Sequence, residues 1–255
     1  MPYLDVPPAQ IYYEDHTGPD NAETLVFLHG AAGNHISWWQ QIPYFSKTYR
    51  CLTIDHRGFG WSADPESLGG NRFVEDLNDL LSWLKIEKVS LICQSMGGRT
   101  GLGFAVHFPE KVNKLVMGGT WGFFDWSEQL QLAAELREDT AGLTLEQRAI
   151  GDKFKKEKPD GAFLYQQIAS LNPPRNQNIT STNNMSPTPE SVANLDIPVL
   201  AIVGSEDIVI PPPLIKTFAD LVPNSQYMEI PDIGHSFYFE DPDQFNRLIE
   251  TFLAE

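Results

Sequence analysis

Cysteine is scarce in this sequence, with Cys51 and Cys93 the only two among 255 residues. Two cysteines cannot form a disulfide framework, and their spacing matches no zinc site, so a disulfide-stapled secreted domain and a zinc module are both excluded. The first residues have neither a basic flank nor an apolar run, so no secretory signal is visible. We therefore expect a cytoplasmic protein with no structural metal.

Basic residues are also few, because 18 Lys and Arg stand against 34 Asp and Glu, for a formal net charge of −16. Such a surface repels phosphate backbones and anionic lipid, so neither nucleic acid nor a membrane surface is an expected partner. The longest apolar stretches, such as Leu25–Leu28 and Val199–Val203, are far shorter than the roughly 18 residues of a membrane helix. We expect a small-molecule substrate, and a chain that works as a monomer or a homodimer.

Short apolar runs alternate with helical patterns along a chain of ordinary globular composition, 42% hydrophobic and 20% charged. Near-continuous apolar runs are typical of strands that are buried on both faces of a parallel sheet. The runs are Thr24–His29, Arg50–Asp55, Val89–Cys93, Lys114–Met117 and Val199–Val203. Asn71–Leu84 and Asp241–Glu255 instead carry apolar residues at three- and four-residue steps, as amphipathic helices do.

Strands separated by helices predict right-handed crossovers and a mostly parallel α/β sheet with helices on both faces. Ile11–Tyr13 is predicted as an antiparallel edge strand. One segment, residues 121–189, breaks the alternation, because its charged helical patterns and its polar Pro/Asn/Ser stretch contain no buried strand. We predict a helical cap there, over the sheet edge where ligands bind, and a core made of residues 1–120 and 190–255. A plain surface insertion is the alternative.

The strongest local signal is Val89–Gly98, in which a buried strand runs directly into Ser95 and two glycines. A sharp strand-to-helix turn of this kind strains the serine backbone and lifts its hydroxyl clear of the sheet. The position two residues before the serine usually holds glycine, and here it holds Cys93, which is also small. Ser95 is the predicted nucleophile, with a helix N-cap as its alternative role. Cys93 is predicted to be a packed thiol.

A nucleophilic serine needs a base, and that base needs a carboxylate to hold it. Among the six histidines, His235 follows the predicted strand Gln226–Ile230, in a loop on the same sheet edge as Ser95, and is the predicted base. Asp207 follows Val199–Val203 and is the predicted acid. Its alternatives are Glu206, Asp232 and Asp125. Of the remaining histidines, His16 and His107 are expected at the surface, and His29 and His56 in structural hydrogen bonds.

An oxyanion formed by attack on a carbonyl needs preorganised N–H donors. The Met96 amide, directly after the nucleophile, is one predicted donor. The loop His29–Asn34 is rich in small residues that allow close backbone approach, and Ala31 is its predicted donor. Neither a Walker motif nor a G-x-G-x-x-G pattern is present, so this loop gives little support to nucleotide binding.

Taken in order, these motifs resemble the α/β-hydrolase superfamily over nearly the whole chain. The matching segments are His29–Gly33, Asp55–Ser62, the turn at Ser95, Gly204–Asp207 and Gly234–His235. The resemblance implies an eight-stranded, mostly parallel sheet, a helical cap after the sixth strand, and catalysis with no metal or organic cofactor. It also implies that Asp55–Ser62 is structural, with Arg57 bracing loops. The chain order serine, aspartate, histidine matches the triad order of that fold.

The residues around the predicted nucleophile narrow the choice among the enzyme classes of this superfamily. Epoxide hydrolases and haloalkane dehalogenases use aspartate at this turn, so Ser95 argues against both. Ser95–Gly98 resembles the turn of carboxylesterases, lactonases, cofactor-free perhydrolases and C–C hydrolases of meta-cleavage products. The C–C hydrolases usually have Asn before the serine and Trp after the histidine, where this sequence has Gln94 and Ser236.

We predict a serine hydrolase that cleaves a small apolar ester or lactone through an acyl-enzyme. A C–C hydrolase acting on β-diketone-like substrates and a slow-turnover ligand receptor on the same fold are the alternatives. Aromatic residues at the start of the cap and after the histidine are the predicted substrate contacts, because such side chains line apolar pockets. They are Trp121, Phe123, Phe124, Trp126 and Phe237. Core packing is the alternative role for part of this set.

Overall fold

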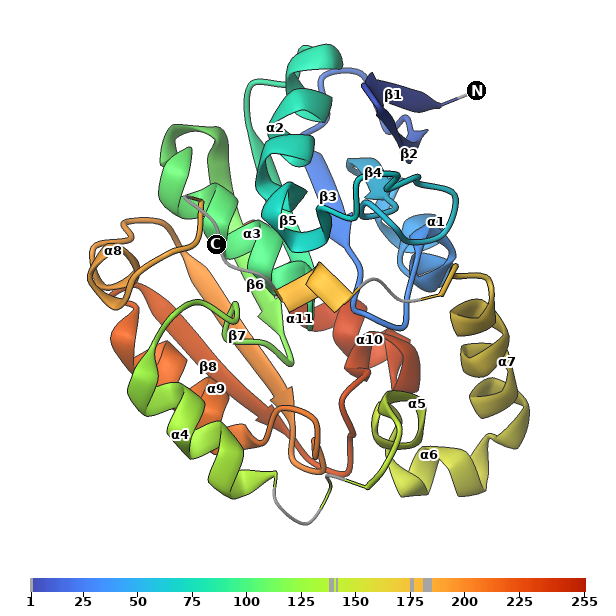
Figure 1. Ribbon diagram of the computed structural model, residues 1–255, viewed down its shortest axis with the longest axis vertical. Helices are drawn as coiled ribbons and strands as arrows, with labels where there is room; N and C mark the ends of the chain where they lie inside the picture. The colour runs from blue at the N-terminus through green and yellow to red at the C-terminus, as the bar shows by residue number, and fades with distance from the viewer. Residues whose placement is uncertain (1, 138–139, 141, 175–176, 181–184) are drawn as a thin grey trace.

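A single eight-stranded sheet, ordered β1-β2-β4-β3-β5-β6-β7-β8, forms the centre of the computed structural model (Figure 1). The structure describes residues 2–137, 140, 142–174, 177–180 and 185–255. The strands are β1 (Tyr3–Val6), β2 (Ala9–His16), β3 (Thr24–Leu28), β4 (Arg50–Ile54), β5 (Val89–Gln94), β6 (Val112–Gly118), β7 (Val199–Gly204) and β8 (Ser225–Ile230). β2 is antiparallel to β1 and to β4, and all the other neighbouring pairs are parallel. The predicted mostly parallel α/β fold is confirmed.

Two apolar layers cover the two faces of the sheet. In β3, Leu25 and Phe27 pack into one layer, whereas Val26 and Leu28 pack into the other, because successive strand side chains point to opposite faces. The helices of the layer that contains Val26 include α2 (Phe73–Trp83), α3 (Gly97–His107) and α9 (Pro212–Leu221). Those of the opposite layer include α1 (Ile42–Phe45) and α11 (Pro242–Ala254). Burial on both faces explains why the sequence of these strands is apolar almost throughout.

The insertion between β6 and β7 contains helices and no strand within its described residues. Its elements are α4 (Ser127–Leu136), α5 (Leu145–Arg148), α6 (Asp152–Glu157), α7 (Pro159–Ser170), η5 (Gln177–Thr180) and α8 (Pro189–Ala193). α5 and α6 are separate helices, because the extended backbone of Gly151 lies between them. α4 packs on α9, and α7 packs on η1 (His35–Trp38) (Figure 1). Residues 138–139, 141, 175–176 and 181–184 of the predicted cap lie outside the described part.

The N-terminal strand differs from its prediction. Ile11–Tyr13 lies in β2, which is antiparallel as expected, but β1 pairs with it and takes the edge position, with Tyr3 opposite Tyr12. β1 is only four residues long and Pro7-Pro8 follows it, so the sequence pattern was too short to indicate a strand. The remaining short elements are η2 (Gly69–Asn71), η3 (Pro109–Lys111) and α10 (Phe237–Glu240). Among the helices of the described residues, none is long and apolar enough to cross a membrane.

Candidate active site

The turn between β5 and α3 holds Ser95 in the left-handed backbone region, with φ of +49°. A residue with a Cβ atom pays a steric cost there, and such conformations persist only where the surrounding structure holds them. Two backbone hydrogen bonds hold this one. The Ser95 N–H donates to the Gly118 carbonyl at 2.9 Å, and the Gly98 N–H donates to the Ser95 carbonyl at 2.9 Å.

Small residues allow the turn to lie close to its neighbours. A Cβ on Gly97 would collide with the Leu28 carbonyl, and one on Gly98 would lie 2.5 Å from Thr120 Oγ1. The cysteine that replaces the usual glycine is accommodated by another glycine, because Cys93 Sγ fills the space that a Cβ on Gly101 of α3 would need. Burial raises the pKa of the Cys93 thiol, which keeps it protonated and packed.

His235 and Asp207 meet at the carboxyl edge of the sheet, where both side chains are buried. His235 Nδ1 lies 2.7 Å from Asp207 Oδ2, while Asp207 Oδ1 accepts from the Val209 N–H at 2.9 Å and the Ile210 N–H at 2.8 Å. These two amides fix the orientation of the carboxylate. Because a carboxylate only accepts, Nδ1 carries the proton and Nε2 is left with its lone pair.

One small pocket contains both Ser95 and His235. Its lining residues are Gly30, Ala31, Ala32, Gly33, Gln94, Ser95, Ala149, Tyr165, His235 and Tyr238. The pocket encloses about 10 Å³, room for about one water molecule. His235 Nε2 is buried and has no hydrogen-bond partner among the described residues. The Gln94 amide donates to the His235 carbonyl at 2.8 Å and so fixes the backbone of the histidine against the turn.

The alternative acids and bases lie elsewhere. Glu206 and Asp125 are exposed, and Asp232 forms a surface ion pair with Lys153 at 2.8 Å. His107 is exposed and His16 is half-exposed beside Glu14. The geometry therefore brings together Ser95, Asp207 and His235, and none of the alternatives weighed from the sequence.

Two further histidines are buried in internal hydrogen bonds. His29 Nδ1 donates to the Gly30 carbonyl at 2.8 Å, and His29 Nε2 accepts from the His56 N–H at 3.0 Å. His56 Nε2 contacts Thr100 Oγ1 at 2.8 Å. Burial lowers the pKa of His29 and of His56, so both rings are neutral parts of the scaffold.

The loop after β3 forms part of the wall of this pocket. The Gly33 N–H donates to the Gly30 carbonyl at 2.9 Å and closes a tight turn, and Ala31 within that turn lines the pocket. Met96 directly precedes α3, so its N–H is among those that a helix leaves without an internal acceptor. Both predicted oxyanion donors thus lie beside Ser95.

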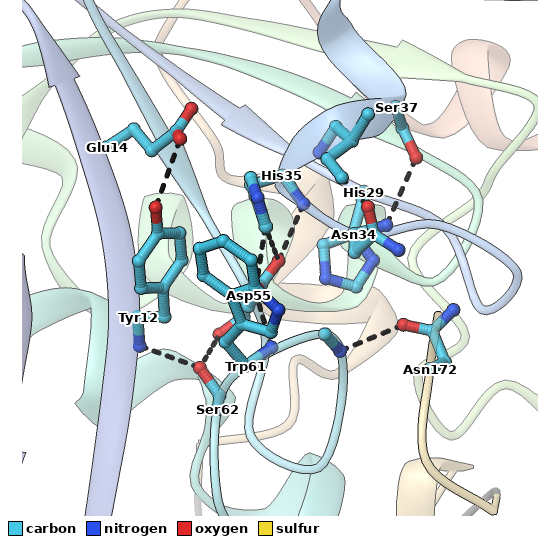
Figure 2. A network of polar contacts seen from close by, with 12 residues as sticks. Tyr12, Glu14, His29, Asn34, His35, Ser37, Asp55, Trp61, Ser62 and Asn172 are labelled. Atoms are coloured by element: carbon cyan, nitrogen blue, oxygen red, sulfur yellow. Dashed lines mark hydrogen bonds and ion pairs between the residues drawn. The ribbon is translucent and has the colours of Figure 1, made fainter. Parts of the chain in front are cut away.

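A network of hydrogen bonds around Asp55 links η1, which follows this loop, to the segment Asp55–Ser62 (Figure 2). His35 approaches Asp55 with its backbone N–H at 2.6 Å and with ring Nδ1 at 2.9 Å, and the Trp61 N–H donates to the same carboxylate at 2.8 Å. Asn172 of the insertion accepts from the Gly60 N–H at 2.9 Å. His35 has no signal in the sequence, because it pairs with a residue twenty positions away in another loop and such a pair leaves no periodic pattern.

Arg57 anchors the segment Asp55–Ser62 to helix α2. Arg57 is buried, and it donates to both oxygens of Asp76 in α2, at 2.9 and 2.6 Å. Arg57 Nη1 also lies 3.9 Å from Asp64. These contacts place Arg57 between loop and helix, away from the pocket at Ser95.

The five aromatic residues predicted to contact substrate do not line the pocket at Ser95. Trp121 and Phe124 are fully buried in one core layer, and Phe237 is buried in the other against Phe245. Phe123 packs on Trp121, and Trp126 stacks on Phe124 with the ring centroids 5.6 Å apart. Aromatic residues at strand ends serve cores and pockets alike, so their clustering did not separate the two roles.

Tyr165 and Tyr238 are the aromatic residues that do line the pocket. The Tyr238 hydroxyl is hydrogen-bonded to Tyr165 and Ser37, and burial raises the pKa of Tyr238. Ser236 Oγ donates to the Tyr165 hydroxyl at 3.1 Å. Among the described residues, no three His, Cys, Asp or Glu side chains are grouped so that they could bind a metal ion.

Comparison with known proteins agrees with this fold. Residues 23–242 match the family model described as the alpha/beta hydrolase fold, and the chain belongs to that family of hydrolases. A Mycobacterium tuberculosis protein that carries the name non-heme bromoperoxidase BpoC is 29% identical, with 95% of this chain and 97% of that protein aligned.

Two further matches cover nearly the same length. A Metapseudomonas resinovorans protein named 2-hydroxy-6-oxo-6-(2'-aminophenyl)hexa-2,4-dienoic acid hydrolase is 27% identical, over 91% of this chain and 84% of its own. The solved structure of a thermophilic esterase from Thermogutta terrifontis superposes with a TM-score of 0.81 at 23% identity, over 100% of this chain and 97% of that one. The superfamily predicted from the sequence motifs is confirmed.

Proposed function

We propose that the protein is a serine hydrolase that cleaves small, uncharged esters or lactones through an acyl-enzyme. One observation carries the proposal: His235 presents an unpartnered, buried Nε2 in the same pocket as Ser95, while Asp207 holds Nδ1 at 2.7 Å. A base with its lone pair free and its other nitrogen fixed is what proton abstraction from a serine hydroxyl requires. Contacts between a nucleophile and its base are often loose before substrate binds.

The chemistry follows from these positions. Ser95 Oγ attacks the carbonyl carbon as its proton passes to His235 Nε2, and the charge of the imidazolium is balanced by Asp207. The N–H groups of Met96 and Ala31 stabilise the oxyanion, and the leaving alkoxide takes the proton from His235 as the acyl-enzyme forms. Water then attacks the acyl group with the same groups in the same roles, which releases the acid and restores Ser95.

The lining of the pocket points to a neutral substrate. Apart from His235, its described lining residues are small, amide or tyrosine residues with no formal charge. Arg99 is buried, but it lines a separate small cavity with Phe123, Phe124 and Met185. An acyl group that enters the pocket at Ser95 meets small apolar residues and the side chains of Tyr165 and Tyr238.

Residues 121–189 act as a cap over this pocket in our proposal. Ala149 and Tyr165 of the insertion form part of the pocket wall, and about 10 Å³ of space does not admit an ester. Substrate therefore enters when this wall moves away from the sheet edge. The Asn34 amide, which donates to the Ile168 carbonyl at 2.9 Å, is one of the contacts that such a movement stretches.

The direct test is turnover of nitrophenyl esters of short acyl chains by the wild-type protein and by Ser95→Ala. Removing the nucleophile should lower kcat by about 10⁶-fold while the circular dichroism spectrum stays unchanged. Cys93→Ala is the matched control, because it removes the rival nucleophile two residues away and should retain turnover. Comparable turnover by folded Ser95→Ala protein would rule out the proposal.

Hydrolysis of a C–C bond in a vinylogous diketone is the second candidate, favoured by the 27% identity to the dienoic acid hydrolase. Gln94 stands directly before the serine and donates its amide to the His235 carbonyl, so its side chain is committed to the scaffold rather than to substrate. Parallel assays with an ester and a dienoic diketone, each over a range of concentrations below and above KM, separate the two activities. A kcat/KM that favours the diketone by tenfold or more would select the second candidate.

A further inference from the structure

Glu240, the last residue of α10, is a buried carboxylate with no part in the proton transfer proposed above. Its side chain is 4% exposed. Oε1 accepts from the Ser236 N–H at 3.1 Å, and Oε2 accepts from the Gly234 N–H at 2.9 Å and from the Gly151 N–H at 3.1 Å. A single side chain thus binds the residues on both sides of His235 and one residue of the cap.

The loop between β8 and α10 depends on these bonds for its shape. Outside the regular ladders of strands and helices, the N–H groups of Gly234 and Ser236 are satisfied by Glu240, and the His235 carbonyl is satisfied by Gln94. Burial raises the pKa of Glu240, whereas the three amides and the neighbouring His235 act in the opposite direction. A buried carboxylate is costly unless it is hydrogen-bonded, so this one is held in place by the loop that it organises.

The third hydrogen bond joins Glu240 to Gly151 of the cap. Gly151 there lies against the loop between β8 and α10, residues 231–236, which we call the histidine loop. Gly151 and Gly234 are in direct backbone contact, because a Cβ on Gly234 would collide with the Gly151 nitrogen. A Cβ on Gly151 would lie 2.8 Å from Glu240 Oε2 and 3.1 Å from the Gly234 nitrogen. Ala149, two residues before Gly151, lines the pocket at Ser95. Glu240 therefore contacts both the histidine loop and the cap segment that forms this wall of the pocket.

We propose that Glu240 is a positioning residue. It couples closure of the cap, through the contact of Gly151 with Glu240, to the alignment of His235. With Gly151 seated, the carboxylate holds Gly234 and Ser236 in the geometry that aims the imidazole at Ser95. When the cap wall moves to admit substrate, one of the three bonds is lost and the loop is less constrained until the cap returns. The inference rests on the proposed function, since it assigns Glu240 a role in aligning the base of that reaction.

The test compares Glu240→Gln with Asp243→Asn, which removes the same charge from an exposed position on α11. A glutamine keeps one acceptor oxygen and places an NH₂ group against a backbone N–H, so it breaks at least one bond without leaving a void. We expect kcat for the nitrophenyl ester to fall 10- to 100-fold with KM changed less than threefold, and Asp243→Asn to match the wild type. Unchanged kcat in Glu240→Gln, or a rise in KM alone, would overturn the inference.

Gly151→Ala tests the cap side of the junction, because its Cβ presses on Glu240 Oε2 and the Gly234 nitrogen while the residues of the histidine loop stay unchanged. This variant stays informative if Glu240→Gln does not fold. We expect kcat to fall severalfold in Gly151→Ala. In the double variant the loss should be smaller than the product of the two single losses, because both changes break the same junction. Losses that simply multiply, or a wild-type kcat in Gly151→Ala, would show that the cap does not act through Glu240.

A spectroscopic readout separates positioning from general destabilisation. In ¹⁵N-histidine-labelled protein, the proton shared by His235 and Asp207 should give a downfield NMR signal that broadens or moves in Glu240→Gln and not in Asp243→Asn. An unchanged signal contradicts the inference. Ser95→Ala keeps the two failures distinct: if that variant retains turnover the proposed function is wrong, whereas an inactive Ser95→Ala with fully active Glu240→Gln refutes only the role of Glu240.

Discussion

The geometry of the site makes a specific prediction for Asp207→Asn, namely that His235 adopts the wrong tautomer for catalysis. Asp207 Oδ1 accepts from two backbone amides, so the amide oxygen of an asparagine takes that position and its NH₂ group takes the place of Oδ2. That group would face His235 Nδ1 at 2.7 Å. Two donors cannot share a hydrogen bond, so His235 must shift its proton to Nε2 and lose the lone pair that Ser95 needs.

The size of the effect follows from the tautomer. A base locked in the wrong tautomer lowers kcat by about 10⁴-fold, which corresponds to about 5 kcal/mol of transition-state stabilisation at 1.36 kcal/mol per tenfold change. The assay is steady-state hydrolysis of a nitrophenyl ester near neutral pH, together with urea unfolding of each variant. Folding should survive, because the two backbone hydrogen bonds to residue 207 are kept.

Glu206→Gln is the matched control, since Glu206 is adjacent in sequence and exposed. It removes one negative charge from the same loop and should leave kcat within twofold of the wild-type value. A folded Asp207→Asn variant with kcat within tenfold of the wild type would refute the assignment of Asp207 as the residue that fixes the base.

Two stability predictions rest on the scaffold of the site. Gly101→Ala should lower the free energy of unfolding by about 1–3 kcal/mol, since its Cβ meets the Cys93 thiol. Adding Cys93→Ala should recover most of that loss in urea unfolding, and a purely additive double variant would contradict the packing argument. Burial lowers the pKa of His29 and His56, so below about pH 6.5 the unfolded chain binds protons that the native chain excludes. The free energy of unfolding should fall with decreasing pH there, by up to about 1.4 kcal/mol per pH unit for each ring, and a flat profile between pH 7.5 and 5.5 would contradict it.

The sheet and the turn at Ser95 were predictable because their physical constraints act locally. A strand buried on both faces is apolar at most positions. β3, β5 and β7 are buried throughout, and their polar side chains are Thr24, Ser90 and Gln94. The turn needs small residues within a few positions of the serine, and the sequence displays them. The cysteine at the usual glycine position could not be interpreted from sequence, because the compensating Gly101 lies in the following helix and meets it only in the folded chain.

Other parts of the site depend on contacts between distant segments. Nothing near His35 in sequence indicates that Asp55 accepts both its backbone and its ring N–H, and Glu240 likewise reaches a cap residue far away along the chain. The aromatic cluster at the start of the insertion packs on a core layer and not at the pocket of Ser95, because apolar surface at a strand end suits a core equally well. Its role in substrate binding stays a prediction. Of the two tyrosines that line the pocket, Tyr238 belongs to the aromatic run after His235, whereas Tyr165 carries no distinguishing local pattern.

Direct detection of the covalent intermediate tests the central claim most closely. Wild-type protein mixed with a slowly deacylating nitrophenyl ester and quenched in acid should carry one acyl group by intact mass, and peptide mapping should locate it on Ser95. The account also predicts that the adduct is absent from Ser95→Ala. An acyl group on any other side chain, or ester turnover with no adduct and full activity in Ser95→Ala, would contradict it.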